Sequence, residues 1–169
     1  ETVEQQSRHV LLDYFKGYVQ ERLPRMGSID LDMQERRDLI DHPLGDHDDL
    51  DQPGARAKRV LRPADLLEYF DEKAHGALLI VGVPGSGNQT MLFRLADALI
   101  ARAEESDPRP MPVVIPLSSW PGDRVDEGQI LADTFTHWLV GRLTAAIKGM
   151  GMSKEVFEGW IRSGELILL

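Results

Sequence analysis

The chain has 169 residues, of which 42% are hydrophobic and 28% charged; this is the composition of a folded globular protein and excludes wholesale disorder. Its net charge of −9, from 28 acidic and 19 basic residues, would repel a phosphate backbone, so we expect no nucleic-acid partner. Cysteine is absent, which excludes disulfides, thiolate zinc sites and a cysteine nucleophile and is typical of a cytoplasmic protein.

Neither a signal peptide nor a membrane segment is expected in this chain. The longest apolar run, Ala77 to Val83, is far shorter than the roughly 20 residues of a membrane helix, and the first residues are polar. The chain begins at Glu1 without a methionine and ends at Leu169 in a strand-like run. We therefore expect both ends to be boundaries within a longer protein.

The N-terminal segment has the pattern of an amphipathic helix that ends before Pro24. Acidic residues on its polar side argue against a membrane-surface helix, so we expect its apolar side to pack against the rest of the molecule. The apolar positions are Val3, Val10, Leu11, Tyr14, Phe15, Tyr18, Val19 and Leu23.

The helical pattern is lost after this helix, and residues 25–62 predict a linker with one short strand near Ile29–Met33. The linker is most acidic at Asp41–Asp51, where two histidines invite a metal hypothesis. Calcium-loop spacing fails because Leu50 stands where an oxygen ligand belongs. We expect a solvated acidic loop and no metal site.

Regular elements return from Pro63 onward, which predicts two parts: residues 1–62 as helix and linker, and residues 63–169 as the first part of a second domain. Strands that alternate with helices of this length predict an α/β fold with a parallel sheet covered by helices. The expected elements are a helix at Pro63–Phe70, a buried strand at Ala77–Val81, a helix at Thr90–Ala103, a strand at Val113–Leu117, a helix at Glu127–Ile147, a shorter helix capped by Ser153 and broken at Gly164, and a strand at Leu166–Leu169.

A glycine-rich turn between the expected strand at Ala77–Val81 and the following helix is the candidate site. Glycines let the backbone curl with its N–H groups pointing inward, and the helix start adds the positive end of its dipole, so this arrangement suits a phosphate. The candidate phosphate-binding residues are Gly82, Val83, Pro84, Gly85, Ser86, Gly87, Asn88, Gln89 and Thr90.

The turn departs from the full Walker A pattern, G-x-x-x-x-G-K-[ST], at two positions. Asn88 stands where lysine would reach the β- and γ-phosphates, and Gln89 where a hydroxyl would hold Mg²⁺. The missing charge predicts weak nucleotide binding with poor or no hydrolysis, although the Asn88 amide can donate a hydrogen bond to a phosphate oxygen. Thr90 could serve as the Mg²⁺ hydroxyl only if the helix began in another register. The alternative interpretation is a strand-to-helix turn that binds no phosphate.

Three stretches, Leu78–Gly87, Leu95–Leu99 and Pro112–Trp120, together resemble bacterial NACHT domains of the P-loop NTPase fold. The strand ending in Leu-Ser-Ser-Trp is the more specific of these, because many NTPases share a glycine-rich loop. The segment Val156–Leu169 is also similar to the family, in which a Trp-Ile helix leads into an apolar strand followed by the acidic Walker B motif. The resemblance begins at about residue 61 and implies that this chain stops just before Walker B.

The resemblance implies a signal-transduction NTPase of the STAND class, in which the nucleotide state switches the molecule between closed and assembled forms. ATP or ADP, with Mg²⁺, would be held by the candidate loop, and the implied partners are other domains of the same chain and further copies on activation. No catalytic residue is assigned. Ser118, Ser119 and Trp120 are expected at a strand end near the nucleotide face, with Trp120 serving mainly in packing.

Two other functions stay open from the residues. One is a degenerate scaffold, in which the fold persists as a protein-interaction module that binds no nucleotide. Asn88 and Gln89 are the residues whose effect on nucleotide binding distinguishes this scaffold from the switch. The other is a P-loop kinase of small molecules, which would normally keep the lysine and which the Leu-Ser-Ser-Trp strand disfavours.

Overall fold

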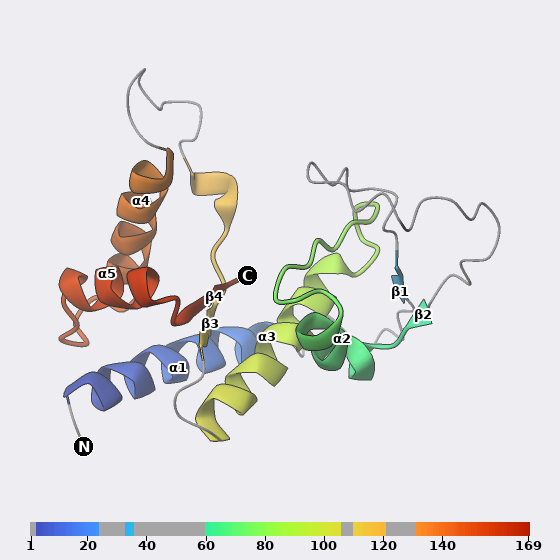
Figure 1. Ribbon diagram of the computed structural model, residues 1–169, viewed down its shortest axis with the longest axis horizontal. Helices are drawn as coiled ribbons and strands as arrows, with labels where there is room; N and C mark the ends of the chain where they lie inside the picture. The colour runs from blue at the N-terminus through green and yellow to red at the C-terminus, as the bar shows by residue number, and fades with distance from the viewer. Residues whose placement is uncertain (1–2, 24–32, 36–59, 106–109, 121–130) are drawn as a thin grey trace. The chain divides into compact units, whose positions relative to one another are not determined.

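The computed structural model describes residues 3–23, 33–35, 60–105, 110–120 and 131–169 (Figure 1). Contacts divide the chain into two compact units, one of residues 1–27 with 80–169 and the other of residues 28–79. These contacts group the N-terminal helix with the helices that follow residue 80. The expected domain division between residues 62 and 63 stays a prediction.

The smaller unit combines a short hairpin-like pairing with a helix. β1 (Met33–Gln34) pairs antiparallel with β2 (Val60–Leu61). A 3-10 turn, η4 (Pro63–Asp65), then leads into α2 (Leu66–Glu72), which buries Leu66, Tyr69 and Phe70. The short helix predicted after Pro63 is thereby confirmed, since proline's fixed φ suits a first helical turn. Of the strand predicted near Ile29–Met33 only its last residue is described, and the acidic loop lies outside the described residues.

The predicted N-terminal helix is confirmed as α1 (Val3–Arg22). Its buried face includes Leu11, Phe15 and Val19, each no more than 2% exposed. The helix ends with the Arg22 guanidinium donating to the carbonyl of Tyr18 over 3.0 Å, which satisfies one of the last free carbonyl groups. As expected for packing rather than membrane binding, α1 lies against another helix of the same unit, α3 (Asn88–Glu105).

The helix predicted at Thr90–Ala103 is confirmed within α3, which begins at Asn88. Its buried residues include Met91, Leu95 and Leu99, which recur every fourth position and so share one face. Between α1 and α3 the Lys16 ammonium contacts the Glu104 carboxylate over 2.8 Å. Packing of this apolar face holds α3 in place. The candidate loop leads directly into the first turn of α3.

Two further helices complete the larger unit: α4 (Leu131–Ala146) and α5 (Lys154–Ser163). Both were predicted, although residues 127–130 of the first lie outside the described residues. The two helices pack against each other, and one hydrophobic core joins them to α1, α3 and the strand β3 (Met111–Val113). Its buried members include Leu11, Phe93, Met111, Val113, Leu139, Leu143, Phe157 and Trp160.

We expect Gly164→Ala to lower the free energy of unfolding by about 1 kcal/mol, measured by urea denaturation. Gly164 ends α5 with a left-handed φ of 72°, and Glu165 N–H donates back to Trp160 O over 2.9 Å. An added Cβ at Gly164 would meet no atom within 4 Å, so the cost is purely conformational.

The matched control is Gly159→Ala, in the same helix and also with no atom within 4 Å of an added Cβ. Alanine favours a helix interior, so this change should stabilise the protein by roughly 0.5–1 kcal/mol. Effects of equal sign in the two variants would contradict the assigned end of α5.

Two strands of the larger unit form a parallel pair, which Figure 1 shows side by side. β3 pairs with β4 (Leu166–Leu168), and Ile115 N–H extends the ladder by donating to Leu169 O over 2.8 Å. Parallel strands need a long crossover connection, and here α4 and α5 lie within it. The predicted terminal strand is confirmed, and the two strands run parallel as their alternation with helices predicts.

The first strand of this pair lies earlier than predicted. We expected Val113–Leu117, whereas β3 starts at Met111 and is followed by a 3-10 turn, η5 (Leu117–Ser119). Pro116 has no N–H to donate and directly precedes that turn. The last backbone hydrogen bond between this run and β4 is the one from Ile115 N–H to Leu169 O.

The buried strand predicted at Ala77–Val81 is wrong. These residues have no regular secondary structure, and Leu79 and Val81 are 66% and 58% exposed. A strand exists only when another strand takes its N–H and C=O groups, and no described strand pairs with this segment. An apolar run with a glycine after it was therefore insufficient to predict burial.

Together the described residues form a mixed α/β structure that is mostly helical, with two sheets of two strands each. The larger parallel sheet of a P-loop NTPase stays a prediction. None of the described helices is both long and apolar enough to span a bilayer.

Candidate functional site

The glycine-rich turn closes directly onto the first turn of α3. Ser86 N–H donates to Val83 O over 3.0 Å, and Met91 N–H donates to Gly87 O over 3.0 Å as the first helical turn forms. Gly85 and Gly87 have φ angles of 83° and 93°, a left-handed conformation that costs other residues roughly 1–2 kcal/mol. The turn predicted from the glycine spacing is therefore present, and its backbone requires those glycines.

Gly82 lies directly against two side chains of the turn. An ideal Cβ built there would lie 2.6 Å from Asn88 Oδ1 and closer still to Ser86 Oγ, distances that real Cβ atoms do not adopt. The φ of Gly82 is not left-handed, so the constraint comes from the two side chains rather than from its backbone. The sequence predicts a glycine here for curling, whereas the structure uses it for close approach.

The start of α3 has favourable electrostatics for an anion. The first N–H groups of a helix have no partner within it, and they carry the positive end of the helix dipole. No acidic side chain lies in the first turn of α3, so nothing there repels a phosphate. Gln89 is exposed at this turn, and Thr90 is buried with 5% exposure.

The residues at the start of α3 do not fit Mg²⁺ in the way the resemblance implies. Asn88 and Gln89 carry neutral amides at the positions of the lysine and the metal-binding hydroxyl. Thr90 has the hydroxyl, but it lies one position further along the helix and is buried. Magnesium prefers a strict octahedral set of hard oxygen ligands with at least one carboxylate. This set supplies only neutral amide oxygens, one of which already accepts from the Ser86 hydroxyl, and no carboxylate or accessible hydroxyl.

The Leu-Ser-Ser-Trp segment after β3 is held by aromatic packing. The ring centroids of Trp120 lie 5.3 Å from those of both Phe135 and Trp138, in edge-on arrangements. The Trp138 indole N–H donates to Ser119 O over 3.1 Å, while Ser118 is exposed. The packing role predicted for Trp120 is confirmed. Its two aromatic partners were not predicted, although both lie within the helix expected at Glu127–Ile147.

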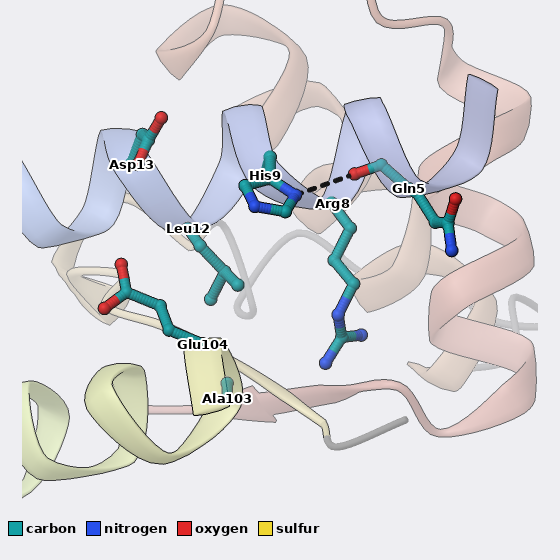
Figure 2. A pocket seen from close by; sticks show the side chains of 7 residues that line it. All are labelled: Gln5, Arg8, His9, Leu12, Asp13, Ala103 and Glu104. Carbon is teal, nitrogen blue, oxygen red and sulfur yellow. Dashed lines mark hydrogen bonds between the residues drawn. The ribbon is translucent and has the colours of Figure 1, made fainter. Parts of the chain in front are cut away.

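A pocket of about 280 Å³ lies between α1 and α3, and no sequence pattern predicted it (Figure 2). The buried Arg8 side chain extends from α1 toward the end of α3, and His9 Nδ1 bonds to Gln5 O over 3.3 Å. The pocket has both signs of charge, because Asp13 and Glu104 also line it. The candidate loop and this pocket are at opposite ends of α3, about 24 Å apart along its axis, so they are separate features.

The ion pair beside this pocket strengthens the contact between α1 and α3. The hydrogen bond to Glu104 raises the pKa of Lys16 above its ordinary value, against a smaller lowering by desolvation and with further raising by nearby carboxylates. Because the folded-state pKa is raised, the contribution of Lys16 to stability is complete below its unfolded-state pKa and is lost only as pH rises through the higher value. The contact is therefore intact at neutral pH.

No protein-family model, curated protein or solved structure matches this chain.

Proposed function

We propose that this chain is the adenine-nucleotide-binding part of a NACHT-type switch of the STAND class, with poor or no hydrolysis. The observation that carries the proposal is the curled glycine turn closed onto the start of α3. Gly85 and Gly87 have left-handed φ angles, the Ser86 and Asn88 side chains pack directly against Gly82, and no acidic residue stands in the first helical turn. Such a turn directs backbone N–H groups at an anion.

The elements that follow the loop support the same function, whereas Ala77–Val81, directly before it, forms no strand. The helix that follows the turn leads into β3, and β3 pairs in parallel with β4, the strand that the resemblance would place before Walker B. Ligands of open parallel sheets bind at the carboxyl ends of the strands, where the Leu-Ser-Ser-Trp segment follows β3. The proposal includes a cytoplasmic location, other domains of the same chain as partners, and assembly with further copies on activation.

The alternative is a degenerate scaffold that binds partners without nucleotide. One observation favours it: the Asn88 amide uses one of its two donor hydrogens within the loop, in a bond to Gly82 O over 3.3 Å. The other hydrogen is the one that could donate to a phosphate. The neutral residues at both Walker A positions point the same way, since each removes an interaction with nucleotide.

The test is calorimetric titration of ATP and ADP, with Mg²⁺, into the unmodified chain and into the double variant Asn88→Lys, Gln89→Thr. We expect weak saturable binding by the unmodified chain and binding about tenfold to a hundredfold tighter by the double variant. The gain corresponds to a charge-assisted hydrogen bond of roughly 1.5–3 kcal/mol.

A change at the far end of α3, Glu105→Gln, is the control and should leave both affinities unchanged. Binding by the double variant alone would favour the scaffold. Binding by neither protein would remove the mechanistic support for the NACHT assignment.

A further inference from the structure

The Asn88 side chain bridges the two ends of the candidate loop. Its Nδ2 donates to the carbonyl of Gly82 over 3.3 Å, and its Oδ1 accepts from the Ser86 hydroxyl over 3.0 Å. Gly82 opens the turn, Ser86 lies near its end, and Asn88 is the first residue of α3. One amide therefore connects the start of the loop, the end of the loop and the helix.

Close packing accompanies these hydrogen bonds. A Cβ built on Gly82 would lie 2.6 Å from Asn88 Oδ1 and 3.1 Å from Asn88 Nδ2, so the amide sits directly against the glycine. The Ser86 hydroxyl crowds the same position. The curled shape of the loop is thus maintained by contacts among Gly82, Ser86 and Asn88, in addition to the left-handed backbone of the glycines between them.

The same contacts restrict what Asn88 can do for a ligand. An amide has two donor hydrogens and one acceptor oxygen, and one donor and the acceptor are already used within the loop. It has no charge to attract a phosphate, in contrast to a lysine. Any phosphate bound here would be contacted mainly by backbone N–H groups.

We propose that Asn88 is a positioning residue that keeps the loop preorganised for phosphate, and that polyphosphate binding at this loop is independent of Mg²⁺. This inference rests on the proposed nucleotide-binding function. The positioning role follows from the two hydrogen bonds of the Asn88 amide. The independence from Mg²⁺ follows from the residues at the start of α3, since Asn88, Gln89 and buried Thr90 do not fit the ion.

The first experiment measures the rate of amide hydrogen exchange in the loop, in the absence of nucleotide. In Asn88→Ala we expect the Ser86 amide, which bonds to Val83 O, to exchange about threefold to tenfold faster, because the bridge no longer closes the turn. The matched control is Gln89→Ala, which removes an exposed amide one residue further on and should leave this exchange unchanged. Ser86→Ala, which removes half of the bridge, should fall between the two.

The second experiment measures the affinity for ATP, ADP and pyrophosphate in Mg²⁺ or in EDTA. For the unmodified chain we expect dissociation constants that agree within about twofold between the two conditions. Asn88→Ala should weaken binding about threefold to tenfold in both, through lost preorganisation. Gln89→Thr, which supplies the missing hydroxyl, should make ATP binding tighter in Mg²⁺ than in EDTA.

The two experiments separate this inference from the proposed function. If Asn88→Ala speeds exchange but no polyphosphate binds under either condition, the loop-holding role stands and the proposed function fails. If polyphosphate binds but Mg²⁺ tightens binding by the unmodified chain tenfold, or Asn88→Ala changes neither exchange nor affinity, the inference is overturned and the proposed function stands.

Discussion

Phe157→Ala should lower the free energy of unfolding by about 3–5 kcal/mol, the largest stability effect that we expect from a single change in this chain. Phe157 has no exposed surface, and its ring packs edge-on against Trp160 with the centroids 5.8 Å apart. It lies in the core that joins the two C-terminal helices to α1 and α3. Truncation removes the buried ring and leaves a cavity that this packed core cannot fully close.

The measurement is urea denaturation followed by circular dichroism, with Glu158→Ala as the control. Glu158 is the next residue of α5 and is exposed, so its truncation should change the free energy of unfolding by less than about 0.5 kcal/mol. A similarly small effect of Phe157→Ala would mean that α5 is not part of the same core as α1. It would also remove the support that α5 gives to β4.

Gly82→Val should weaken ATP and ADP binding by about tenfold to a hundredfold, which corresponds to a loss of about 1.4–2.8 kcal/mol of binding free energy. The new Cβ would have to displace Ser86 Oγ and Asn88 Oδ1, both of which crowd that position. Global stability should change by less than about 0.5 kcal/mol, because Gly82 is exposed and lies outside the helices and strands. The expected signature is lost binding with retained folding.

Titration and urea denaturation of the same samples check this result. The control is Gly141→Ala, since an added Cβ at Gly141 meets no atom within 4 Å and should leave binding intact. If Gly82→Val binds nucleotide as the unmodified chain does, the phosphate does not use this loop, and the function that we propose for it fails. Loss of binding together with unfolding would instead show that Gly82 supports the fold.

The candidate loop was predictable in place but not in its internal contacts. The spacing of Gly82, Gly85 and Gly87 before a helical pattern indicates a tight turn, because only glycine adopts left-handed φ or admits close approach at low cost. The role of Asn88 was not predictable in the same way. Which groups its amide contacts depends on how the turn closes around Gly82, and the order of residues does not specify that closure.

The sequence by itself determined the helices of this protein and the turn that precedes α3. A helix forms its backbone hydrogen bonds between residues four positions apart. Its periodicity and a terminating residue such as Gly164 can therefore be recognised in a short stretch of sequence. The same holds for α1, whose apolar face already indicated packing.

Only the tertiary structure decided which apolar runs become paired strands. Leu166–Leu168 pairs with β3, which lies some 50 residues earlier, whereas Ala77–Val81 has no partner among the described residues and leaves Leu79 and Val81 exposed. A strand needs hydrogen-bond partners from elsewhere in the chain. Hydrophobicity and β-propensity therefore do not determine strand formation without the rest of the fold.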